Sequence, residues 1–108
     1  MSTNNENPQE SNSEGYKLPT AQCLQNAARL SVVEDKPIML DYWLESLKSD
    51  TSILIGVKSD DEKLLVKSAE EYTSPIQKIF KVSDEYIIIS ENSIYVVSKN
   101  IPSRRISS

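Results

Sequence analysis

The segment 76–98, IQKIFKVSDEYIIISENSIYVVS, places the strongest constraint on what this 108-residue chain can fold into. Its apolar, largely β-branched runs at 79–82, 86–89 and 94–97 are separated by two short polar stretches. Runs of this kind predict strands joined by tight turns. Asn92 tolerates a positive φ angle and is expected to close the second turn. Because a two-stranded hairpin is marginal in water, the rest of the chain is expected to supply further strands.

Both faces of the last two predicted strands are apolar, since side chains alternate between the faces of a strand. Either the rest of the chain covers both faces, or one face is a docking surface for another protein. If the faces are covered, Ile88 lies in the core. If one face is open, it forms a partner-binding site, for which the candidate residues are Ile87, Ile89, Tyr95 and Val97.

The composition narrows the possible functions. The chain has 12 Lys and Arg against 16 Asp and Glu, and its net charge of −4 opposes binding to nucleic-acid phosphates. It has no histidine, which removes the commonest general base and most zinc sites, so we expect no enzyme activity and no cofactor. Cys23, the single cysteine, is expected to be an ordinary core thiol. No stretch resembles a membrane span or a secretion signal.

Three regions follow from the distribution of apolar residues. Residues 1–20 are almost entirely polar and are expected to form a disordered arm, with Tyr16 and Leu18 as the only apolar anchors near its end. A small β domain is expected over 21–102, and a flexible tail over 103–108. Arg104 and Arg105 before Ser107 resemble a basophilic kinase target.

Two segments of the predicted domain are ambiguous. Thr20 can cap a helix that carries Leu24 and Ala27 on one face, whereas the following Leu30, Val32 and Val33 favour a strand. The alternation after Pro37 favours a strand in the first half of 38–47, although leucines there also fit helical spacing.

Clearer strands are predicted at 52–58 and 63–68. Gly56 lies inside the first of them, where a glycine indicates a bulge or a close backbone approach. Six or seven short strands predict an all-β fold: a small antiparallel barrel, SH3-like or related, or a compact sandwich.

Four blocks of the sequence carry a resemblance to known proteins. They are DKPIMLDYW at 35–43, EKLLVKS at 62–68, EYTSPI at 71–76 and EYIIISENSIY at 85–95. As a set they resemble a family of short uncharacterised proteins of large double-stranded DNA viruses of algae and protists, over about residues 27–107. The resemblance implies a viral protein of the virion or host cytoplasm, such as a minor capsid protein whose partners are capsid proteins. It supplies no site residues.

Two further patterns have functional and purely structural interpretations. The carboxylates of Asp60, Asp61 and Glu62 suit a hard cation, but they lack the spaced ligands of a calcium loop, so the sequence favours a solvated turn. Aromatic side chains and lysines could together bind single-stranded nucleic acid on a small barrel. That set comprises Tyr42, Trp43, Tyr72, Tyr86 and Tyr95 with Lys63, Lys67, Lys78, Lys81 and Lys99. The sequence favours a non-enzymatic structural or protein-interaction protein, with this nucleic-acid-binding barrel as the alternative.

Overall fold

The computed structural model of the chain describes residues 17–106, which form a β-rich fold of seven strands and two helices. The three predicted strands of the central segment are confirmed, with slightly longer bounds. The strands are β2 Ile38–Met39, β3 Leu54–Val57, β4 Lys63–Val66, β5 Ile76–Val82, β6 Glu85–Ser90, β7 Ile94–Ser98 and β8 Ser103–Arg105. The helices are α1 Ala21–Glu34 and α2 Trp43–Ser46.

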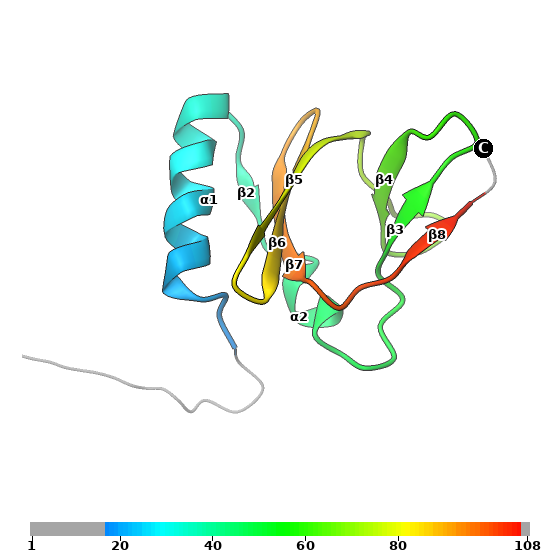
Figure 1. Ribbon diagram of the computed structural model, residues 1–108, viewed down its shortest axis with the longest axis horizontal. Helices are drawn as coiled ribbons and strands as arrows, with labels where there is room; N and C mark the ends of the chain where they lie inside the picture. Colours follow the sequence, from blue (N-terminus) through cyan, green and yellow to red (C-terminus); the bar gives the residue numbers. More distant parts are fainter. Residues whose placement is uncertain (1–16, 107–108) are drawn as a thin grey trace, which may run out of the picture.

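The strands form two mixed sheets, one in the order β2-β7-β6-β5 and the other in the order β4-β3-β8. β5, β6 and β7 are antiparallel neighbours, but β2 runs parallel to β7 and β8 runs parallel to β3. The expectation of a purely antiparallel fold is therefore wrong. In Figure 1, α1 lies on one side of the four-stranded sheet and the three-stranded sheet lies on the other.

Helix α1 decides the first ambiguous segment in favour of a helix. Thr20 caps it as predicted, because its hydroxyl oxygen accepts a hydrogen bond from the backbone N–H of Cys23 at 3.2 Å. The strand favoured for the residues around Val32 is wrong, since the helix continues to Glu34 and ends at Asp35, whose φ is 56°. Val32 is 83% exposed, so its β-branched side chain reflects neither a strand nor a core position.

The second ambiguous segment combines both alternatives. The strand expected after Pro37 is confirmed but covers only the two residues of β2, and the chain then turns into α2. Tyr42 and Trp43 are buried at this turn. The indole Nε1 of Trp43 donates a hydrogen bond to the backbone oxygen of Lys17 at 2.7 Å. The domain therefore includes residues from Lys17 onward, four residues earlier than predicted.

Two serines, and not Asn92, adopt the special geometry of the two turns in the central segment. Ser83 takes up the positive φ of 55° between β5 and β6, whereas Asn92 is not among the described residues with positive φ. In the turn between β6 and β7, the hydroxyl of Ser90 accepts hydrogen bonds from the backbone N–H groups of Asn92 and Ser93. The expectation that Asn92 closes this turn through a positive φ is therefore wrong.

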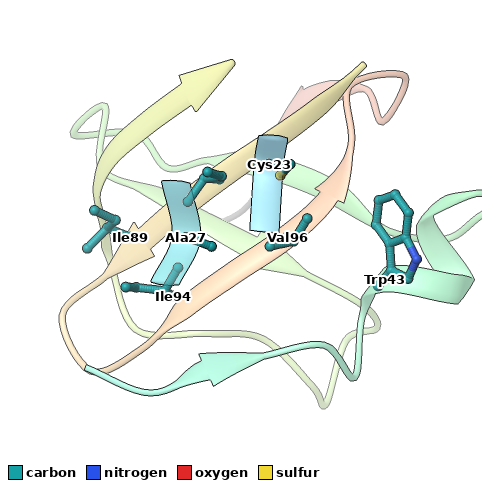
Figure 2. Packing of buried hydrophobic residues seen from close by; sticks show 7 residues of the cluster. Cys23, Ala27, Trp43, Ile89, Ile94 and Val96 are labelled. Atoms are coloured by element: carbon teal, nitrogen blue, oxygen red, sulfur yellow. The ribbon is translucent and has the colours of Figure 1, made fainter. Parts of the chain in front are cut away.

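Two hydrophobic clusters share the four-stranded sheet. On the face toward α1, Cys23 and Ala27 of the helix pack onto β6 and β7, with Trp43 at the side, as Figure 2 shows. On the other face, Ile88 and Val97 pack against Ile55 and Leu65 of the second sheet and against Ile53, which directly precedes β3. Ile88 is completely buried, as predicted. The chain itself therefore covers both apolar faces.

The second sheet ends in a segment that was expected to be a flexible tail. β8 pairs with β3, and the backbone N–H of Ile106 then donates to the oxygen of Val57 at 3.0 Å. A methyl group built at Gly56 would lie 2.7 Å from Cδ1 of Ile106, so a side chain, and not the predicted bulge or close backbone approach, occupies the space over this glycine. Ser107, the predicted phosphorylation site, lies outside the described residues.

Candidate protein-interaction site

The four residues predicted to form a docking face do not share a face. Ile87 lies opposite Val96 and Ile89 opposite Ile94, so both belong to the side that α1 covers. Tyr95 lies opposite Ile88, on the side that faces the second sheet together with Val97. Ile87, Ile89 and Val97 are fully buried, and Tyr95 is partly buried. These residues are therefore core residues, and the predicted partner-binding site is wrong.

The aromatic residues of the nucleic-acid alternative are also separated by the fold. Tyr42 and Trp43 are buried, and the rings of Tyr42 and Tyr95 pack against each other in the core at 5.4 Å between centroids. Tyr72 is exposed on the outside of the second sheet. Bases stack on exposed rings, so these aromatic side chains do not form one stacking surface.

The lysines of that alternative fall into two groups. Lys67 forms an ion pair with Glu71, and Lys99 with Asp84. Lys63, Lys78 and Lys81 lie at or beside β5, and within residues 17–106 none of them takes part in an ion pair. Lysines without an ion-pair partner therefore lie on β5, at Lys78 and Lys81, and at the start of β4, at Lys63.

Neither Cys23 nor the acidic turn offers a reactive centre. Burial, and then the neighbouring carboxylate of Glu85, raise the pKa of the Cys23 thiol to about 11, so it stays protonated at neutral pH. In the turn between β3 and β4, Asp61 pairs with Arg105 at 3.1 Å and Glu62 pairs with Lys58 at 3.1 Å. These carboxylates already have cationic partners from the protein.

Strand β5 is the longest free edge of either sheet. It pairs with β6 on one side and with no strand of the described chain on the other. It has seven residues, against two, four and three for the other edge strands β2, β4 and β8. Its residues 77–81 are all exposed. A free edge presents unpaired backbone N–H and C=O groups, which can bind a strand from another chain.

The side chains of β5 combine apolar and positive groups on both sides of the edge. Lys78 and Phe80 lie opposite Ile89 and Ile87, on the side of α1. Ile79 and Lys81 lie opposite Ile88 and Tyr86, on the side of the second sheet. Phe80 is 40% exposed and Ile79 is 36% exposed. An incoming strand would therefore meet one large apolar side chain and one lysine on each side.

Neighbouring elements hold this edge in place. On the side of α1, the hydroxyl of Ser83 donates to Oε1 of Gln22 at 3.5 Å, and Nζ of Lys36 donates to Oε1 of Gln77 at 2.9 Å. One bond thus joins the first turn of α1 to the residue after β5, and the other joins the segment after α1 to the start of β5. On the other side, a polar hollow of about 540 Å³ separates β5 from the start of β4. It is lined by Asp61, Glu62, Lys63, Pro75, Ile76, Gln77, Lys78, Ile79 and Glu91.

The sequence contains a local signal for this free edge. Lysines inside an otherwise apolar strand are typical of sheet edges, where they limit indiscriminate pairing. Lys78 and Lys81 interrupt IQKIFKV in this way, and a register shift next to Ile76 adds a bulge. The sequence does not identify Phe80 as an edge residue, because one strand alone does not reveal on which side a neighbouring strand is missing.

Comparison of the chain with protein-family models, curated proteins and solved structures gives no match. Within residues 17–106, no helix is long and apolar enough to cross a membrane.

Proposed function

We propose that this protein is a non-enzymatic protein-interaction module that binds an extended segment of a partner protein along the free edge of β5. The observation that supports this proposal is the run 77–81, which is exposed on an unpaired edge strand and contains Ile79 and Phe80. In strand addition, backbone hydrogen bonds supply affinity and alternate side chains supply specificity. Burying the two large side chains adds a favourable apolar contribution.

The resemblance to viral proteins suggests where such a module would act. We propose that its partners are other proteins of a large virus particle or of the infected host cytoplasm, where it would be a minor virion component. We also propose a compact sandwich as its finer fold class. The support is the cluster of buried side chains that both sheets contribute, including Ile55 and Ile88.

The function can be tested with a surface variant that leaves the core intact. Phe80→Ala should abolish most of the partner binding that the tagged wild-type protein shows in its native cell, because it removes the largest apolar contact on the edge. Val32→Ala, at an 83% exposed position on α1, should leave this binding unchanged. Mass spectrometry of the co-purified proteins provides the measurement.

Hydrogen exchange then distinguishes strand addition from other contacts. The backbone N–H groups of 77–82 that point away from β6 should exchange rapidly in the free protein and slowly in the complex, because a paired strand protects them. Unchanged exchange of these groups in a complex that Phe80→Ala does not weaken would contradict the proposal. Tight, salt-sensitive binding to single-stranded nucleic acid at physiological ionic strength would favour the nucleic-acid alternative.

A further inference from the structure

We infer that the segment bound by β5 has the pattern acidic, apolar, apolar, acidic, matched residue by residue to Lys78, Ile79, Phe80 and Lys81. This inference rests on the proposed function of the same edge. Residues directly opposite each other on paired strands point to the same side and lie within contact distance. Four consecutive partner residues therefore face a lysine on the α1 side, then the two apolar side chains, then a lysine on the other side.

The pattern does not depend on the direction of the incoming strand. Read forward or backward, the motif places an acidic residue opposite Lys78, another opposite Lys81, and apolar residues opposite Ile79 and Phe80. The two middle residues lie on opposite sides of the new strand, as Ile79 and Phe80 do on β5. The same motif therefore fits β5 whether the incoming strand runs parallel or antiparallel to it.

The charges around the edge favour an acidic segment. Lys78 and Lys81 have no ion-pair partner within the described residues, and Lys63 lines the hollow beside them, also without one. Lys36 reaches the same strand through its hydrogen bond to Gln77. Among the carboxylates that line the hollow, Asp61 and Glu62 are paired with other cations, which leaves Glu91 as the only opposing charge there.

A second copy of the chain does not fit this edge. It would bring its own Lys78 and Lys81 to the paired stretch, and like charges on neighbouring strands are destabilising. The full sequence also contains no run of two apolar residues flanked by acidic residues on both sides. The segment that fits therefore belongs to a different protein.

Short labelled peptides test the inference directly. The acidic peptide Thr-Thr-Glu-Val-Val-Glu-Thr-Thr should bind the full chain more tightly than the basic peptide Thr-Thr-Lys-Val-Val-Lys-Thr-Thr, by about tenfold in Kd at low salt, as two exposed charge pairs would give. The preference should decrease with added salt. Fluorescence anisotropy measures both affinities on the wild-type protein, so this part needs no variant.

Charge reversal provides the decisive comparison. Lys78→Glu combined with Lys81→Glu should invert the preference, so that the basic peptide binds more tightly. Lys48→Glu combined with Lys99→Glu changes the net charge equally beside α2 and should leave the preference as in the wild type. Lys48, Lys78 and Lys81 are exposed and Lys99 is half-buried, and unchanged thermal unfolding would verify that both variants fold.

Other outcomes would overturn the inference in distinguishable ways. Equal binding of both peptides, with protection of 77–82 from hydrogen exchange, would reject the acidic pattern and leave strand addition standing. Binding of neither peptide, together with partner binding that Phe80→Ala does not affect, would reject the proposed function as well. Dimerisation of the wild-type chain that Lys78→Glu changes would show that a second copy occupies the edge. Binding of oligothymidine that the double charge reversal abolishes would assign the edge to nucleic acid.

Discussion

Ile88 lies at the centre of the four-stranded sheet and belongs to the cluster shared by the two sheets. Its neighbours across the strands are Ile79 on β5 and Tyr95 on β7. Its side chain points toward the second sheet, where it joins the cluster that includes Ile53 and Leu65. The Ile88 side chain thus links β5 and β6 to the three-stranded sheet β4-β3-β8.

Truncating this side chain should cost much of the stability of the domain. Ile88→Ala should lower the free energy of unfolding by about 2–5 kcal/mol, because the cavity in a packed core is only partly filled by relaxation. Val32→Ala, which also shortens a β-branched residue, should change it by less than about 0.5 kcal/mol, since Val32 is on the surface. Urea denaturation measures both values. An equal, small effect of the two changes would mean that Ile88 does not lie in the core.

At the scale of single elements, β8 and Gly56 depend on each other. β8 is three exposed residues long and is held by its pairing with β3 and by the Ile106 side chain, which lies over Gly56. A side chain at Gly56 would compete for this space with Ile106, and with Val66, whose Cγ2 would be 3.1 Å from the new methyl group. A side chain at this position would therefore force the Ile106 side chain to move away from β3.

Gly56→Val should destabilise the domain by about 1–3 kcal/mol, the usual cost of overpacking. It should also speed hydrogen exchange at the backbone N–H of Ile106, which bonds to Val57. Adding Ile106→Ala to Gly56→Val should restore part of the lost stability, because the smaller side chain makes room. Additive losses in the double variant, measured by urea denaturation, would show that the two residues do not compete.

The sequence predicts some elements well because their signals are local. The central strands follow from the density of β-branched residues, and the cap of α1 follows from Thr20. The end of α1 could not be predicted, since Val32 and Val33 favour strands locally while packing of the helix on the sheet decides otherwise. β8 could not be predicted either, because its residues Ser103–Arg105 are polar and its partner β3 lies far away in sequence.

The docking face predicted from the sequence is wrong because of the register between β6 and β7. Alternation within a strand is a local property, but which residues share a face across two strands depends on the pairing between them. The observed register places Ile87 beside Val96 and not beside Val97. A free edge is a property of the whole sheet and emerges only when the order β2-β7-β6-β5 is known.

At the scale of the whole molecule, the charge is unevenly distributed along the chain. Three of the 16 acidic residues, Glu6, Glu10 and Glu14, lie in 1–16, whereas all 12 basic residues lie between Lys17 and Arg105. The described domain is therefore much closer to neutral than the net charge of −4 indicates. Under the proposed function, the local charge at β5, and not the total, should select the segments that bind there.

Removing the polar N-terminal segment should have little effect on the domain. Deletion of residues 1–14 should leave the melting temperature within about 2 °C of the full chain, because this segment has almost no apolar area to bury. Deletion of residues 1–19 should lower it by several degrees, since it removes buried Pro19 and the Lys17 oxygen that accepts the Trp43 hydrogen bond. Circular dichroism measures both; a large drop for the shorter deletion would place residues 1–14 against the domain.

Trp43 is placed so that its intrinsic fluorescence can report on the helix side of the fold. It is the only tryptophan of the chain, it is 3% exposed, and its ring packs where α2 meets the cluster beneath α1. Fluorescence excited at the long-wavelength edge of the protein's absorption therefore comes from Trp43 alone, whose indole lies beside the Lys17 carbonyl. The emission wavelength of Trp43 reports how far its indole ring is shielded from water. Release of the residues before α1 or opening of the helix side of the fold would shift the emission to the red, without any label near β5.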